Sequence, residues 1–258
     1  MTEHERAQPP SRRIADALRE AIRAGTYAPG DQLPSERALA SEHGTARNTA
    51  KAAITLLQVE GLVTVEHGRG AYVRRAGRMM RMGAQRYSRR VRTETGLSPF
   101  RAEAQRLGKT ARVEVPDISR TTPPADVAER LRVSPDEPSV VQRVNHYFAD
   151  DEPVQIGTTY IPWTIAEGSV LATDAKTGTG SIYGRFSELG HEITQAREEI
   201  TARMPRPDEV KALAIPPGVP VMEVLHTGID QDGEPFEVTR FVMRADTNAL
   251  DYLLTIED

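Results

Sequence analysis

A histidine, an arginine and two glycines lie next to one another at positions 67–70, in the stretch HGRGAYV. An arginine is a forked cation that can hold two phosphate oxygens, and glycine lets the backbone adopt positive φ angles and approach another molecule closely. The spacing matches neither of the two glycine-rich phosphate loops, GxGxxG and GxxxxGK followed by Ser or Thr. Taken alone, the stretch therefore favours a hairpin turn with one solvated arginine over a phosphate-binding turn.

A second group of polar residues lies in a stretch with helical periodicity at 46–60. Its apolar residues fall on one side of the helix, and its polar residues fall roughly opposite, with no acid before Glu60. A solvated face of an amphipathic surface helix usually mixes both signs of charge, whereas arginine and asparagine near a helix N-terminus read guanine and adenine in a major groove. The apolar side carries Ala46, Ala50, Ala53, Ile54 and Leu57, and the polar side carries Arg47, Asn48, Lys51, Thr55 and Gln58.

Both groups belong to one short series of predicted elements. Residues 11–25 have helical periodicity that ends at Gly25, and a second helix begins after Ser35, whose side chain can cap it. The helix at 46–60 is the third, and two short strands at 62–66 and 71–75 flank the glycine-rich turn. Three helices followed by a hairpin are the element order of a winged helix-turn-helix.

The composition limits the class of protein. The chain has 258 residues, of which 38% are hydrophobic and 27% charged, as is typical of a soluble globular protein with one or two domains. No apolar run is long enough for a membrane span and no signal peptide precedes the polar start, so we expect a cytoplasmic protein without a membrane partner. The absence of cysteine excludes disulfides, thiol nucleophiles and cysteine-bound zinc.

Charge is unevenly distributed along the chain. The first 92 residues carry 17 Lys and Arg against 9 Asp and Glu, although the whole chain has a net charge of −4. This asymmetry indicates a polyanion-binding module joined to an acidic domain that does not bind polyanions. The arginine-rich stretch at 76–96 shows little apolar periodicity, and we expect a solvated linker that can add electrostatic affinity for DNA.

From residue 112 onward the pattern changes to strands. Two hairpins are predicted, one at 140–148 and 154–162 with a turn at Asp150–Asp151, the other at 221–229 and 235–243 with a turn at Asp232–Gly233. Short helices are expected near 124–131, 181–189 and 207–214. The two hairpins share one plan and could be neighbours in a single antiparallel sheet of an α+β domain.

The run at 29–73 resembles the DNA-binding domain of the GntR family of bacterial transcription regulators. The resemblance rests on LPSER at 33–37, the LA pair before Gly44, Arg47 followed by Thr49, EGLV at 60–63 and the GRG wing tip. Two positions depart from the family pattern: Ala46, where Ser or Thr often caps the helix and touches phosphate, and Ala50, where a larger aliphatic often packs. The resemblance implies DNA contacts by Arg37, Arg47, Asn48, Thr49, Lys51, His67, Gly68, Arg69 and Gly70.

The C-terminal part, at 97–252, resembles the UTRA effector-binding domain of the HutC-type subfamily, whose fold is related to chorismate lyase. The matching motifs are QRV, DDEPV, TTYIP, DGEPFEV and the closing MRADTNALDY. Many members carry an acid where Gly157 stands, so the effector here is expected to lack the group which that carboxylate would hold. The resemblance places effector contacts where the hairpins meet, at Arg143, Tyr160, Glu237, Thr239 and Arg240.

Two other functions compete with a regulator. One is an enzyme of chorismate-lyase-like fold fused to a DNA-binding module, but the six histidines show no HExxH spacing, and neither a GxSxG elbow nor a distinctive carboxylate pair is present. The other is a plain architectural DNA binder, which would not need a long acidic domain. Both remain less favoured alternatives.

We therefore expect an α+β protein with an N-terminal winged helix-turn-helix domain at 1–75, a linker at 76–96 and an antiparallel-sheet UTRA-like domain at 97–258. Two recognition helices on a two-fold axis read a pseudo-palindrome, so the expected form is a homodimer on double-stranded DNA. An arginine in the second domain suits a carboxylate or phosphate, so the expected effector is a small anionic metabolite that controls a repressor. No cofactor or metal is expected.

Overall fold

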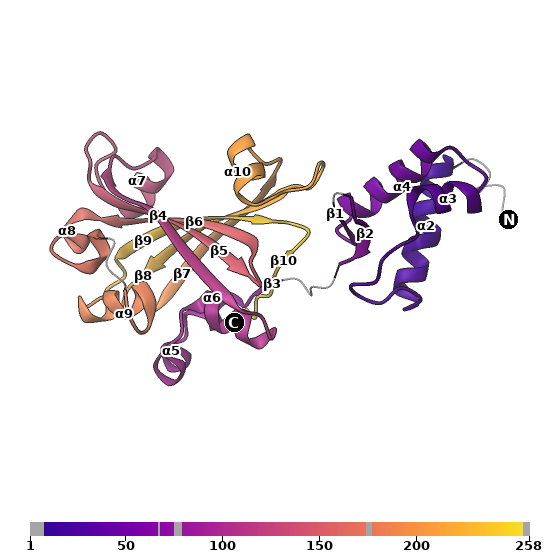
Figure 1. Cartoon of the computed structure of the whole chain (residues 1–258). Helices are drawn as coiled ribbons and strands as arrows, with labels where there is room; N and C mark the ends of the chain where they lie inside the picture. The colour runs from indigo at the N-terminus through magenta and orange to yellow at the C-terminus, as the bar shows by residue number, and fades with distance from the viewer. Residues whose placement is uncertain (1–7, 67, 75–78, 174–176, 255–258) are drawn as a thin grey trace. The chain divides into compact units, whose positions relative to one another are not determined.

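The computed structural model describes residues 8–66, 68–74, 79–173 and 177–254. The chain forms two compact units (Figure 1). The first comprises residues 1–77 with the short segment 215–219, and the second comprises residues 78–214 with 220–258.

In the described residues, the first unit consists of helices followed by a hairpin, as the sequence predicts. The elements are α2 (Pro10–Arg23), α3 (Glu36–Glu42), α4 (Arg47–Val59), β1 (Val63–Glu66) and β2 (Gly70–Val73) (Figure 1). Ser35 caps α3, because its Oγ accepts a hydrogen bond from the Ala38 N–H at 3.2 Å. The Leu33 N–H donates to the Ala71 carbonyl at 2.8 Å, which ties the segment before α3 to the antiparallel β1–β2 hairpin.

Burial fixes the orientation of α4. Its apolar side packs against α2 in the core of this unit, and burying each large aliphatic side chain contributes about 1.5–3 kcal/mol. The polar side of α4 therefore faces solvent. Ala46 differs from the prediction, since it is exposed and precedes the helix in an extended conformation. The buried residues are Ala50, Ala53, Ile54 and Leu57 of α4, with Ile14, Ala15 and Leu18 of α2.

The second unit is built on one six-stranded antiparallel sheet with the order β4-β5-β6-β9-β8-β7. Its strands are β4 (Ala111–Thr121), β5 (Val140–Ala149), β6 (Glu152–Pro162), β7 (Gln195–Arg203), β8 (Val221–Ile229) and β9 (Pro235–Arg244). The two predicted hairpins, β5–β6 and β8–β9, meet through the pairing of β6 with β9. Asp150, Asp151 and Gly233 adopt positive φ angles in the hairpin turns.

Helices cover both faces of this sheet (Figure 1). Val140 and Tyr160 pack with residues of α7 on one face, whereas their neighbours Val141 and Ile161 pack with residues of α8, η2 and α9 on the other. The helical elements are α6 (Pro99–Arg106), α7 (Ala125–Leu131), α8 (Trp163–Ala166), η2 (Val170–Ala172), α9 (Ser181–Glu188) and α10 (Pro207–Ala212). This alternation follows from the two-residue period of a strand and decides which side chains share a face.

The prediction of a solvated linker at 76–96 is corrected by the structure for residues 79–95. These residues fold as part of the second unit. They form β3 (Met79–Arg81), the 3-10 helix η1 (Gly83–Tyr87) and α5 (Arg89–Thr95). Strand β3 pairs in parallel with β10 (Asn248–Leu250) near the end of the chain. Arg81 is only 3% exposed, and its buried charge pairs with Glu198. Local periodicity could not indicate this partner, because it is distant in sequence.

Candidate nucleic-acid interface and ligand cavity

The outer face of α4 carries the predicted DNA contacts. Arg47, Asn48 and Lys51 are exposed there, and Thr49 is half-buried. The Arg47 Nε donates to Glu36 Oε2 at 2.8 Å, an ion pair from α3 that the sequence pattern did not reveal. Arg37 is also exposed on α3.

The N-terminus of α4 has no side-chain cap, because Ala46 stands at the N-cap position. The first N–H groups of a helix lack intrahelical partners, and the helix dipole places partial positive charge there. The free N–H groups at this end, beside Arg47 and Asn48, can therefore donate hydrogen bonds to a phosphate oxygen, as helix ends commonly do at DNA backbones.

The wing is a tight turn between β1 and β2. Gly68 and Gly70 have φ angles of +74° and +117°, and the exposed Arg69 pairs with Glu66 at 2.6 Å. Gln32 Nε2 donates to the Arg69 carbonyl at 2.7 Å and holds the turn in place. His67, the remaining predicted wing contact, lies outside the described residues.

Gly70→Ala is expected to destabilise the wing by roughly 1–2 kcal/mol. An added Cβ would lie 2.8 Å from Gln32 Nε2 and would force out the side chain that holds the turn. Exchange of the Leu33 and Val73 amides, both hydrogen-bonded within this region, should become about 5–30-fold faster. Gly68→Ala is the control, since its Cβ meets nothing within 4 Å and only the backbone strain remains. Equal exchange rates in the two variants would contradict the role of Gln32.

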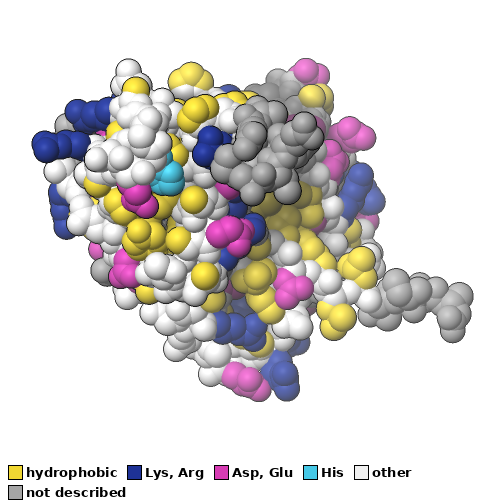
Figure 2. Space-filling model, turned by 90° about the vertical axis from the view of Figure 1, so that its right-hand side faces the viewer, with side chains coloured by type: hydrophobic (Ala, Val, Ile, Leu, Met, Phe, Trp, Pro, Cys, Tyr) yellow, Lys and Arg dark blue, Asp and Glu magenta, His cyan; other side chains and the backbone are white. Residues whose placement is uncertain are grey.

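The N-terminal unit is less basic than the charge count over residues 1–92 suggested. Residues 1–77 carry 11 Lys and Arg against 9 Asp and Glu, because the remaining arginines up to Arg92 belong to the second unit. On the face drawn in Figure 2, Lys and Arg lie at several separate places and are interspersed with Asp and Glu. Any DNA interface therefore depends on the placement of a few cations rather than on a large net charge.

A cavity of about 490 Å³ lies in the second unit against the sheet face opposite α7. Its volume falls in the range of small-molecule sites. The floor comes from β5, β6 and β9, and the walls come from η1, α6, β4 and α9. The described residues that line it are Arg86, Gly96, Ser98, Pro99, Phe100, Arg101, Val113, Val115, Arg143, Asn145, Tyr147, Thr159, Thr177, Gly178, Ser181, Ile182, Tyr183, Thr239 and Phe241.

Arg143 is the central cation of this cavity. Its Nη1 donates to the Leu171 and Thr173 carbonyls at 2.7 and 2.9 Å, while its Nε has no hydrogen-bond partner among the described residues. Burial lowers the pKa of the Arg143 guanidinium, an effect that Tyr147 partly opposes. A buried N–H without an acceptor is unfavourable, so this nitrogen is suited to an anionic ligand atom.

Register brings Arg143, Thr159 and Thr239 side by side across three strands. Thr159 Oγ1 and Thr239 Oγ1 lie 2.9 Å apart, and Thr239 donates to Glu237 Oε2 at 2.6 Å. Glu237 itself is fully buried behind the cavity lining, where its Oε1 accepts a hydrogen bond from the Tyr183 hydroxyl at 2.7 Å. Burial acts to raise the pKa of Glu237, but His226 and these hydrogen bonds outweigh it and lower that pKa.

Besides Glu237, which lies behind the lining, two other predicted effector contacts do not reach the cavity. Tyr160 follows Thr159 and points to the opposite face, where it packs with Val127 and Leu131 of α7. Arg240 follows Thr239 and pairs with Asp126 and Glu223 on that same opposite face. The expectation that all five residues converge is corrected, because consecutive residues of a strand face opposite sides.

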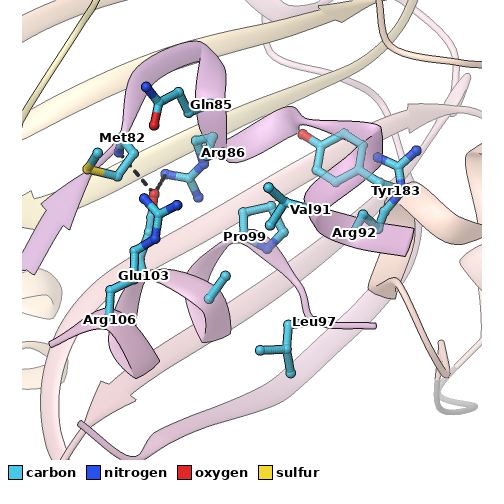
Figure 3. A pocket seen from close by; sticks show the side chains of 11 residues that line it. Met82, Gln85, Arg86, Val91, Arg92, Leu97, Pro99, Glu103, Arg106 and Tyr183 are labelled. Carbon is cyan, nitrogen blue, oxygen red and sulfur yellow. Dashed lines mark hydrogen bonds and ion pairs between the residues drawn. The ribbon is translucent and has the colours of Figure 1, made fainter. Parts of the chain in front are cut away.

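Other residues of the cavity were missed by sequence reasoning. Arg86 lies in the arginine-rich stretch, where no apolar periodicity indicates which side chains turn inward. Tyr183 lies in a predicted helix, but no neighbouring polar residue in the sequence distinguished it as a ligand contact. A second, smaller cavity has a volume of about 20 Å³. Among its lining residues, most of which Figure 3 labels, the Met82 N–H donates to Glu103 at 3.1 Å and Arg86 pairs with that carboxylate at 3.4 Å. Arg86 and Tyr183 line both cavities.

The described residues offer neither a candidate metal site nor a candidate membrane span. No group of three or more His, Asp or Glu side chains there is placed to hold a metal ion. No helix among them is long and apolar enough to cross a membrane.

Comparison with known proteins covers both units. Residues 10–73 match the family model of bacterial regulatory proteins, gntR family, and residues 106–248 match that of the UTRA domain. An HTH-type transcriptional regulator of Streptomyces coelicolor is 30% identical over 258 residues, with 96% of each chain covered. The HTH-type transcriptional repressor NagR of Bacillus subtilis is 26% identical, with 90% of this chain and 89% of NagR covered. The solved structure of PhnF from Mycobacterium smegmatis shares the fold, with a TM-score of 0.59, 21% identity and coverage of 95% and 100%.

Proposed function

This chain belongs to the gntR family of bacterial regulatory proteins and carries a UTRA domain, and from that premise we propose that it is a homodimeric repressor controlled by a small anionic metabolite. As a transcriptional regulator it is not an enzyme, and the UTRA domain sets it apart from a plain architectural DNA binder. The observation that carries the proposal is the cavity in the second unit, which holds a buried arginine with an unpaired nitrogen.

DNA recognition is assigned to α4 and the wing. The exposed face formed by Arg47, Asn48 and Lys51 suits the base edges of a major groove, and the uncapped end of α4 suits a phosphate. Arg69 is suited to contact the DNA phosphate backbone or the adjacent minor groove. A homodimer is proposed because one such module makes few base contacts, and two on a two-fold axis read both halves of a pseudo-palindrome.

Control by the effector is a linkage between two equilibria. A ligand that binds better to a dimer arrangement unable to hold DNA lowers operator affinity by the ratio of its two affinities. Such couplings typically amount to about 1–3 kcal/mol, or a 5–150-fold change in operator affinity. Footprinting the protein on the DNA upstream of its own gene, followed by challenge with small acids, tests the proposal. Operator binding that no small acid changes would remove the control by an anionic effector.

Arg143→Gln is expected to leave operator affinity in the absence of ligand within about twofold, while the response to a small acid is lost. The variant stays polar but removes the fixed positive charge and the guanidinium that reaches the Leu171 carbonyl. Arg112→Gln is the matched control, because Arg112 is an exposed arginine of the same unit that pairs with Glu114 and Asp151. Operator binding with and without the acid is the measurement. A normal response in Arg143→Gln would remove this residue from the site.

A further inference from the structure

The charges that line the 490 Å³ cavity are all positive among the described residues. Arg86, Arg101 and Arg143 contribute guanidinium groups, and no lining residue is an acid. Arg86 Nε and Nη1 have no hydrogen-bond acceptor, although Arg86 approaches Glu103 at 3.4 Å, and Arg143 Nε has none either. Both side chains are more than nine-tenths buried. The lining of this cavity therefore contains two incompletely paired arginines, one from η1 and one from β5. Such a pair favours an anionic ligand.

The same cavity also carries neutral polar groups, among them the side chains of Ser98, Asn145, Thr177 and Ser181, but no carboxylate in its described lining. Glu237 accepts hydrogen bonds from the lining residues Tyr183 and Thr239 and is itself 0% exposed. The Thr159 hydroxyl joins that chain through Thr239. Because no carboxylate belongs to the described lining of the cavity, the hydroxyls of a sugar would pair there only with neutral groups or arginines, without the charge-assisted acceptors that hold them most strongly.

Four aromatic rings contribute apolar surface to the lining. Tyr147 and Phe241 close over Gly157, where a Cβ would lie 3.1 Å from each ring, so rings occupy the place at which a longer side chain would stand. Phe100 packs edge-on to Tyr147 with ring centroids 5.0 Å apart, and Tyr183 adds a further ring. Flat apolar groups bind such surfaces by stacked or edge-to-face contact.

Building on the proposed control by an anionic ligand, we propose that the ligand class of this cavity is a small aromatic carboxylic acid, rather than a sugar acid or a sugar phosphate. The carboxylate accepts hydrogen bonds from Arg143 and Arg86, and the ring lies among Phe100, Tyr147 and Phe241. A single anionic group with an apolar body pairs with the arginines and needs no carboxylate to hold its remaining atoms.

The test compares ligands on the full-length protein. Benzoate and cinnamate are the aromatic acids, glucuronate is a carboxylate with many hydroxyls, glucose 6-phosphate is a sugar phosphate, and benzyl alcohol is a ring without the charge. Trp163, the single tryptophan of the chain, lies in the second unit, so its fluorescence follows thermal unfolding of that unit. At equal concentration we expect a rise in the unfolding temperature only with the aromatic acids, and by calorimetry at least tenfold weaker binding of glucuronate, glucose 6-phosphate and benzyl alcohol.

Arg143→Gln and Arg143→Lys locate the binding. We expect the aromatic acid to bind at least tenfold more weakly to Arg143→Gln, with partial recovery in Arg143→Lys and no change in Arg112→Gln. The melting curve without ligand checks that each variant is folded.

Each other outcome overturns a distinct claim. Stronger Arg143-dependent binding of glucuronate or glucose 6-phosphate overturns the ligand class and leaves control by an anion standing. Failure of both aromatic acids to bind overturns the ligand class. Binding that Arg143→Gln does not weaken overturns the location of the ligand in this cavity. Aromatic acids that bind in the cavity without changing operator binding refute the proposed control alone.

Discussion

Arg47→Ala is expected to weaken specific operator binding by roughly 1–3 kcal/mol per half-site and to relax the preference at one base pair of each half-site. Arg47 occupies the first turn of α4 and is exposed, so its guanidinium is free to swing toward a base edge. In the proposed homodimer this residue is present twice, so both half-sites are expected to lose a contact.

The ion pair with Glu36 does not reverse this expectation. Arg47 Nε lies 2.8 Å from Glu36 Oε2, but the Arg47 side chain is 75% exposed, and exposed pairs contribute about 0–1 kcal/mol. A bidentate contact to a base is worth more than the pair it replaces. Glu36→Gln should accordingly leave operator affinity unchanged or raise it slightly.

Footprinting and a salt series on wild type and variant provide the measurement. Arg132→Ala is the matched control, because Arg132 is an exposed arginine with a single acidic partner, Glu234, in the second unit. A footprint of Arg47→Ala with unchanged affinity and sequence preference would show that α4 is not the recognition helix. A loss that is uniform across sequences would instead assign Arg47 to phosphate.

The sequence predicted the strongly patterned elements and missed those held by distant partners. Helix α4 combines a wide apolar stripe with a polar face, and Ser35 marks the start of α3, so both could be read locally. Strand β3 is only three residues long and exists through β10, which lies near the other end of the chain. The edge strands β4 and β7 were also missed, since both are largely exposed and show no clear apolar alternation.

The candidate cavity was predicted in part, and the error has a simple geometric cause. Strand alternation explains why Arg143 and Asn145 both line the cavity, but Thr239 and Arg240 were both assigned to the site although adjacent strand residues point apart. Register was needed to learn that Arg143 lies opposite Thr159 rather than Tyr160. Arg86 enters the cavity from η1, in a stretch that has no periodicity to reveal its orientation.

The same arginine-rich stretch carries a buried ion pair of the second unit. Arg81 Nη2 donates to Glu198 and, at 2.8 Å, to the Tyr87 hydroxyl. Glu198 also accepts a hydrogen bond from Tyr252 and lies 3.1 Å from His226 Nδ1. The Arg81 and Glu198 side chains are 3% and 7% exposed, so neither charge has water to replace its partner. The pair joins β3, directly after the first unit, to the edge strand β7.

Arg81→Ala is expected to destabilise the second unit by about 3–5 kcal/mol, because it leaves the Glu198 carboxylate buried without its cation. Urea unfolding followed by Trp163 fluorescence measures this unit alone. Arg132→Ala serves again as the control, since loss of its exposed pair with Glu234 should change stability by no more than about 1 kcal/mol. A similar small change for Arg81→Ala would show that the buried pair is not needed for stability.

Acid provides an independent check on the same pair. Burial acts to raise the pKa of Glu198, but the hydrogen bond to His226 and the charge of Arg81 outweigh it and hold that pKa well below its ordinary value of 4.5. A carboxylate with a lowered pKa in the folded state contributes stability that is fully present above its unfolded pKa and is lost as the pH falls toward the folded pKa. The free energy of unfolding of the wild-type second unit should therefore fall steeply below about pH 4.5. Arg81→Ala should show a shallower fall, because its Glu198 titrates closer to the unfolded value. Parallel pH profiles for the two proteins would mean that Arg81 does not hold Glu198 in its charged form.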